Sequence, residues 1–369
     1  MAEALTRGAI THGHEAELFP TRACASAHAV SLLYWPGWNG CVALGNYIAW
    51  ADIVHIHGLW TLPTSAAALL ARCYPRPYII MPHGMLDRWS LRRSHRKKQV
   101  YAMLIERRNL DQASALHFLN HEECEEAKDF GCKAPSFVLP NGVDTKIFQA
   151  LPGKDSLLAQ HPRLRGKILA LFLGRLHPKK GLDLLIPALS RARKHVPALH
   201  LLIAGPDEDG YCAQVVSWVR DHGLDHAVTF LGEVTGANKL AVFAAADLFV
   251  LSSYQEGDSM AVKEALAAGL PVLITRACHF SEVETAQAGI VVQPNIDEVA
   301  DALIKLGANR ESRSNMSQNA RRFIDRSYRW EIIVGQLMDV YQDIVSGRKD
   351  AACWHCQLLT DCDAGRGCL

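Results

Sequence analysis

Two glutamates in one short stretch have the charge and the spacing of a binding site. The stretch YQEGDSMAVKEALAAGLPVLIT (254–275) contains Glu256 and, eight positions later, Glu264. Apolar residues surround the second glutamate at helical spacing, which predicts a buried helix with Glu256 in the loop before it. A buried carboxylate is costly without a partner. The two hydroxyls of a ribose would supply one, and the alternative is an ordinary exposed Glu256 with Glu264 salt-bridged to Lys263 or Arg276.

The residues just after Glu256 add backbone donors to this stretch. The helix is expected to begin at Ser259 or Met260, with Asp258 or Ser259 as its N-cap. The N–H groups from Gly257 to Met260 would then point at the phosphates of a ligand. Glu256 would reach the hydroxyls of a sugar held beyond those phosphates.

A second motif, GRLHPKKG (174–181), follows the apolar run ILALFL and precedes a predicted helix. Gly174 lets the backbone turn sharply and approach a ligand closely. Arg175 and Lys180 place two cations at the carboxyl edge of the predicted strand, which suits a diphosphate. The motif is neither a Walker loop nor a nicotinamide fingerprint, because it lacks both glycine patterns. The alternative is a solvated basic turn.

The elements that position these motifs are short apolar strands alternating with amphipathic helices. Continuous rather than alternating hydrophobicity indicates sheets covered on both faces, as in parallel α/β proteins. A helix is predicted over 181–195 and another over 296–306. The strands are predicted at 52–58, 78–84, 114–119, 168–174, 199–205, 227–232, 247–253, 271–275 and 289–292.

The strand–helix rhythm occurs twice, which predicts two doubly wound domains facing each other across a cleft. The polar stretch 149–166 carries two prolines and two glycines and suggests the boundary. We therefore expect an N-terminal Rossmann-like domain over 1–150 and a C-terminal one over 151–329. The helix 330–347 is expected to return to the first domain. Ligands in such sheets bind at the carboxyl ends of the strands.

Length and composition are those of a soluble two-domain protein. The chain has 369 residues, of which 49% are hydrophobic and 21% charged, and its net charge is +1. That balance gives no nucleic-acid-binding field over the whole molecule. The apolar runs are far shorter than the ~20 residues that span a bilayer, and the first residues do not resemble a signal peptide. The expected compartment is the cytoplasm.

The ordered set of motifs resembles the retaining GT-B glycosyltransferases, especially their family 4. The resemblance covers roughly residues 50–345. EGDSMAVKE has the family's spacing of two glutamates, and GRLHPKKG fits its donor-diphosphate motif. The other matching segments are PNGVD (140–144), AAADLFVLSSY (244–254), ALAAGLPV (265–272) and RRFIDRSYRWE (321–331).

This resemblance implies a role for each matching residue. Arg175 and Lys180 would neutralise the leaving nucleoside diphosphate, so that no metal is required. Glu264 would bind the ribose and Glu256 the transferred sugar, with Gly174 close to the phosphates. His83, in PHGMLDRW after the predicted strand YIIM, would face the donor sugar from the N-terminal domain; the alternative is a structural histidine at a strand end.

The resemblance predicts transfer of a sugar from a nucleotide-sugar donor to a glycan or lipid-linked glycan, in cell-surface polysaccharide assembly. A nucleotide-sugar epimerase and a non-catalytic relative are the competing classes. Family members begin with a strand and a glycine-rich loop. The opening MAEALTRGAITHGHEAELFPT instead looks like the first helix followed by the second strand, so we expect the N-terminal sheet to lack its first strand.

Two further segments carry open predictions. The segment 88–108 concentrates arginine and lysine, which is typical either of a basic helix resting on anionic lipid at the inner face of the plasma membrane or of a solvated helix. The tail 348–369 holds Cys353, Cys356, Cys362 and Cys368. Their spacing does not fit a standard zinc site, so a disordered tail is expected.

Overall fold

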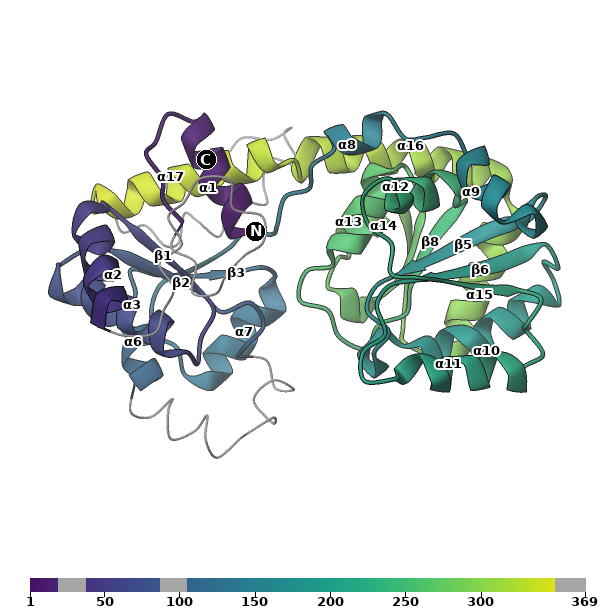
Figure 1. The fold of residues 1–369 in the computed structure, drawn as a ribbon, viewed down its shortest axis with the longest axis horizontal. Coiled ribbons are helices and arrows are strands. Elements are labelled where there is room, and N and C mark those ends of the chain that lie inside the picture. Colours follow the sequence, from purple (N-terminus) through teal and green to yellow (C-terminus); the bar gives the residue numbers. More distant parts are fainter. Residues whose placement is uncertain (19–37, 87–104, 349–369) are drawn as a thin grey trace, which may run out of the picture. The chain divides into compact units, whose positions relative to one another are not determined.

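The computed structural model describes residues 1–18, 38–86 and 105–348 (Figure 1). The chain divides into two compact units, one formed by Met1–Gly142 together with the chain from Trp330 onward, the other by Val143–Arg329. The basic segment 88–108, as far as residue 104, and the cysteine-rich tail from residue 349 lie outside the described residues. Each unit is an α/β layer structure, as the alternating apolar runs predicted.

The first unit is built on a parallel four-stranded sheet in the order β1-β2-β3-β4. Three of its strands coincide with predicted apolar runs, whereas the last was missed because it is only three residues long. The strands are β1 (Val54–His57), β2 (Tyr78–Met81), β3 (Ala115–Phe118) and β4 (Ser136–Val138).

Helices cover both faces of this sheet. Successive strand residues point to opposite faces, so Ile80 packs with α2, α3, α6 and α7, whereas Ile79 packs with α1 and α17. Burial on both sides explains the continuous hydrophobicity of the strands. The helices are α1 (Ala2–Thr11), α2 (Trp38–Trp50), α3 (Leu62–Cys73), α6 (Arg107–Asp111), α7 (His121–Phe130) and α17 (Trp330–Val345).

The second unit contains a parallel six-stranded sheet in the order β10-β9-β8-β5-β6-β7. From β5 the chain winds outward through β6 and β7, then returns to place β8 on the other side of β5. The crevice where the winding direction reverses is the usual ligand site of such sheets. The strands are β5 (Ile168–Leu173), β6 (Leu199–Ala204), β7 (Val228–Gly232), β8 (Leu248–Leu251), β9 (Val272–Thr275) and β10 (Gly289–Val292).

The helices of the second unit form two layers (Figure 1). One face carries α10 (Leu182–Arg193), α11 (Tyr211–Asp221) and α15 (Ile296–Ala308), with α15 packed along α10. The other carries α9 (Asp155–Gln160), α12 (Gly236–Ala245), α13 (Met260–Ala267) and α16 (Arg310–Ser327), with α13 packed on α16. The remaining short helices are α8 (Lys146–Gln149), η2 (Pro162–Leu164), η3 (Pro178–Lys180), η4 (Arg276–Cys278) and α14 (Glu282–Thr285).

The division between the units falls at Gly142, earlier than the boundary at residue 150 that the sequence suggested. The Val143 N–H donates to the Tyr328 carbonyl at 2.7 Å, and Val143 forms an isolated bridge with Arg329. Phe148 is buried against Phe243 of α12. These contacts tie the segment after Gly142 to the second unit. In the described ranges, no helix is both long and apolar enough to span a bilayer.

Candidate functional site

The loop after β5 lies at the point where the winding reverses, and it holds the motif GRLHPKKG (174–181). Its short helix η3 is preceded by His177, whose Nδ1 accepts from the Lys179 N–H at 3.1 Å. Gly181 follows in the left-handed conformation, with a φ of 68°. A side chain at Gly181 would collide with the Ser252 carbonyl. Glycine therefore allows this loop to run directly against the end of β8.

Lys180 and Glu256 form an ion pair at this crevice. The Lys180 Nζ lies 2.6 Å from Glu256 Oε1, and the two side chains are only 17% and 9% exposed. The Ser253 hydroxyl donates to the same carboxylate oxygen at 2.5 Å. Thr275, at the end of β9, donates in turn to the Ser253 carbonyl at 2.5 Å. Residues at or just after the ends of three adjacent strands thus hold one cation and one acid together, largely shielded from water.

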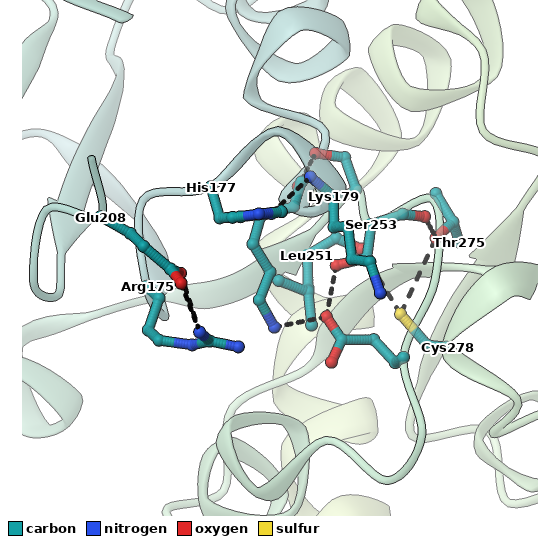
Figure 2. A network of polar contacts seen from close by, with 11 residues as sticks. Arg175, His177, Lys179, Glu208, Leu251, Ser253, Thr275 and Cys278 are labelled. Atoms are coloured by element: carbon teal, nitrogen blue, oxygen red, sulfur yellow. Dashed lines mark hydrogen bonds and ion pairs between the residues drawn. The ribbon is translucent and has the colours of Figure 1, made fainter. Parts of the chain in front are cut away.

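Arg175 is placed differently from Lys180. Its Nη1 donates to both oxygens of Glu208, at 2.8 and 3.0 Å, and Figure 2 shows the two side chains beside the loop that carries His177. The arginine side chain is 64% exposed, so this ion pair contributes little to stability. Glu208 lies in the loop after β6, and the sequence reasoning missed it because no spacing rule links it to the motif.

Glu264 has a protein partner on a neighbouring helix. Lys239 of α12 places its Nζ 2.7 Å from Glu264 Oε1, with side chains 31% and 17% exposed. The expectation that this carboxylate needs a partner is confirmed, whereas the suggested partners, Lys263 and Arg276, were wrong. Lys263 precedes Glu264 on α13, and adjacent helical residues do not face each other. It pairs instead with Asp258.

The loop that leads into α13 is close to its predicted form. The helix begins at Met260 with Ser259 at the N-cap position, although the Ser259 side chain makes no capping hydrogen bond. A side chain built at Gly257 would meet no atom within 4 Å. The loop therefore borders open space at Gly257.

His83 lies in the first unit, at the turn after β2. Its Nε2 is 3.0 Å from Nδ1 of His57 at the end of β1. His83 has a φ of 56°, a left-handed conformation that a non-glycine residue adopts at some cost and that clusters at functional sites. The turn is fixed by Glu123, whose carboxylate accepts from the Gly84 N–H at 2.6 Å and from the Leu119 N–H at 2.8 Å.

The contact between His57 and His83 belongs to a histidine cluster that also contains His55 and His117, in which His117 is buried and the other three are half-buried. His117 Nε2 lies 2.7 Å from the Leu139 carbonyl, so it must donate there. His117 Nδ1 then accepts from His55 Nε2 at 3.3 Å, and His55 Nδ1 accepts from the Tyr341 hydroxyl at 2.6 Å. This order requires neutral His55 and His117. The alternation V-H-I-H in β1 places His55 and His57 on one face, which is a signal that the sequence offered.

Burial keeps the cluster neutral. It lowers the pKa of His57 to about 3, with the neighbouring His83 as the second cause. It also lowers the pKa of His83 and of His117 to about 4. At neutral pH these rings therefore act as uncharged hydrogen-bonding groups.

The depressed pKa values predict acid sensitivity of the first unit. Between about pH 6.5 and pH 4 the histidines are protonated in the unfolded chain but remain neutral in the folded cluster. The free energy of unfolding that is present above pH 6.5 is therefore lost as the pH falls. Acidification to about pH 5 is expected to cost about 1–2 kcal/mol per histidine. Urea unfolding followed against pH measures the loss, and His57→Gln should reduce its slope. A free energy of unfolding that stays constant over this range would contradict the prediction.

Both halves of the chain match known families. Residues 2–147 match the family described as Glycosyltransferase Family 4, and residues 154–323 match Glycosyl transferases group 1. The two matches meet near the division between the units and together span most of the chain.

Named relatives and solved structures agree with these matches. The chain is 30% identical over 300 residues to the GDP-mannose-dependent alpha-(1-6)-phosphatidylinositol monomannoside mannosyltransferase of Mycobacterium tuberculosis, covering 77% of this chain and 76% of that protein. It is 26% identical over 298 residues to the GDP-mannose:cellobiosyl-diphosphopolyprenol alpha-mannosyltransferase of Xanthomonas campestris, covering 79% and 74%.

Anabaena HepE in complex with UDP shares the fold, with a TM-score of 0.71 at 20% identity over 83% of this chain and 82% of that one. A glycosyltransferase from Rickettsia africae also shares it, with a TM-score of 0.70 at 13% identity over 93% of this chain and 94% of that one. Sequence matches over both halves, a relative at 30% identity and these shared folds lead to one conclusion. The chain belongs to the GT-B glycosyltransferases of family 4.

Proposed function

We propose that this chain transfers a sugar, with retention of anomeric configuration and without a metal, from a nucleotide-sugar to a hydroxyl of a glycan or lipid-linked glycan in cell-surface polysaccharide assembly. The observation that carries the proposal is the ion pair of Lys180 and Glu256 at the crevice between the ends of β5 and β8. A cation for the diphosphate and an acid for the sugar are the two groups that a nucleotide-sugar requires. Here they are already side by side.

Donor binding would exchange the partner of Lys180. The diphosphate takes the ammonium group, with Arg175 as a second cation, and Glu256 keeps the Ser253 hydroxyl while it accepts from a sugar hydroxyl. The backbone at Gly174 and from Gly257 to Met260 lies along the phosphates. Charge develops on the leaving diphosphate as its bond to the anomeric carbon breaks, and cations fixed at that place stabilise the transition state most.

Two further residues would contact the donor. Glu264 accepts from the ribose hydroxyls, and neutral His83 bonds a hydroxyl of the donor sugar. The acceptor oxygen attacks the anomeric carbon on the face from which the diphosphate departs. The departing phosphate oxygen takes the acceptor proton, so the protein need not supply a nucleophile.

GDP-mannose is the donor that we propose, because the two named relatives described above use it. A pocket beside the diphosphate loop supports a guanine base. Leu176, Ile203 and Phe230 line it with apolar side chains, and Asp207 and Glu233 are also among its lining residues. A carboxylate can accept from the two adjacent N–H groups of guanine, which uracil lacks.

The test is release of nucleoside diphosphate by the full chain, with GDP-mannose and UDP-glucose compared. The acceptors are a polyprenyl-diphosphate disaccharide and a mannosylated phosphatidylinositol. We expect GDP release that depends on acceptor, and an α-linked product by NMR. An inverted product would overturn retention, turnover of UDP-glucose alone would overturn the donor, and failure to bind either donor in calorimetry would overturn the function itself.

A further inference from the structure

Three lysines pair with three acids around the donor loop, and one pair differs from the other two. Lys180 and Lys239 remain partly accessible, with side chains 17% and 31% exposed. The Lys263 side chain is only 1% exposed and holds Asp258 at 2.5 Å. The first two ammonium groups can therefore change partners when a ligand binds, whereas Lys263 lies beneath the loop and cannot reach a ligand.

The Lys263 side chain packs against a cluster of aromatic residues. Its Nζ lies 5.1 Å from the centre of the Tyr328 ring. That ring packs edge-on against Phe280 and Phe323 at 5.1 and 5.3 Å. Burial lowers the pKa of Lys263, while Asp258 and Glu282 act in the opposite direction. The ammonium group therefore has a fixed place, with Asp258 as its close charged partner.

Asp258 is the residue whose position this pair decides. It belongs to the loop that would lie along the donor phosphates, and its side chain is 9% exposed because it turns down toward Lys263. Without that cation the carboxylate would lose the charged partner that holds it at 2.5 Å, and breaking a buried ion pair by removing one partner is strongly unfavourable. The carboxylate would turn to the open side of the loop at Gly257, where its charge would repel a diphosphate.

We propose that Lys263 is a positioning residue for donor binding, which draws the Asp258 carboxylate beneath the loop and away from the space that the diphosphate occupies. The proposal rests on the proposed function, since it concerns the same loop. Lys263 touches no part of the donor. It acts through Asp258, so its effect must vanish when the Asp258 charge is removed.

The test compares Lys263→Met with Lys263→Met/Asp258→Asn. Calorimetry on the full chain gives the Kd for GDP, or for UDP if the wild type binds that instead. We expect Lys263→Met to weaken binding about tenfold or more, because like charges become juxtaposed. The Kd of the double variant should lie within about threefold of the wild-type Kd, since replacing both members of a buried ion pair by uncharged residues is often neutral.

Salt separates this role from a purely structural one. The factor by which Lys263→Met raises the Kd for the nucleotide should shrink between about 0.01 M and 1 M salt, because ions screen the repulsion between the carboxylate and the diphosphate. A double variant that folds and binds as weakly as Lys263→Met would overturn the proposal, as would wild-type affinity in Lys263→Met. If Lys263→Met does not fold, the double variant alone decides by the threefold criterion. Absence of any nucleotide binding by the wild type would instead count against the proposed function.

Discussion

Replacing Lys180 with alanine is expected to lower kcat/KM for the donor by about 100- to 1,000-fold without unfolding the chain. The variant loses the cation that would meet the leaving diphosphate. It also leaves Glu256, which is 9% exposed, with the Ser253 hydroxyl in place of an ion pair. Steady-state kinetics with the proposed donor measures the loss, and thermal unfolding checks the fold.

A matched control removes a lysine at the far end of α10, the helix that follows the loop of Lys180. Lys194 is an exposed residue at the C-cap of α10, and Lys194→Ala should keep kcat/KM near the wild-type value. Lys180 and Glu256 are in contact. The double variant Lys180→Ala/Glu256→Ala should therefore lose less transition-state stabilisation, measured from kcat/KM, than the two single variants lose together. Full activity in Lys180→Ala would refute the assigned diphosphate site.

Sequence patterns were sufficient for most of the framework. The run ILALFL became β5, and the loops after β5 and β8 fell at the point where the sheet reverses its winding. These predictions succeeded because continuous hydrophobicity reports burial on both faces of a parallel strand. β4 escaped prediction because Ser136–Val138 is too short to show a period.

The ion pairs of the site could not be obtained in this way. Lys239 lies on α12 and Glu208 after β6, and only the folded sheet brings them to Glu264 and Arg175. One error was avoidable: adjacent residues on a helix face different directions, which excludes Lys263 as the partner of Glu264. The hydrophobic pattern of the sequence indicates which face of a helix or strand is buried. The partner of a charged side chain depends instead on how separate helices and strands pack against each other in the folded protein.

Replacing Glu264 with alanine is expected to raise the Kd for GDP by about 10- to 150-fold, as the loss of a charged hydrogen bond implies. The carboxylate is only 17% exposed and is held by Lys239, so it is fixed before the ribose arrives. Transfer activity should fall with it. Calorimetry with GDP and with 2′,3′-dideoxy-GDP measures the effect.

The dideoxy ligand is the decisive control, because it lacks the hydroxyls that Glu264 would accept from. If the acid binds the ribose, Glu264→Ala should weaken GDP strongly and the dideoxy ligand hardly at all. Lys239→Met should raise the Kd for GDP less than Glu264→Ala does, because the ribose hydroxyls donate to Glu264 in place of the lost ammonium group once the ligand is bound. An equal loss for both ligands would show that Glu264 acts through the packing of α12 and α13 and not through the sugar.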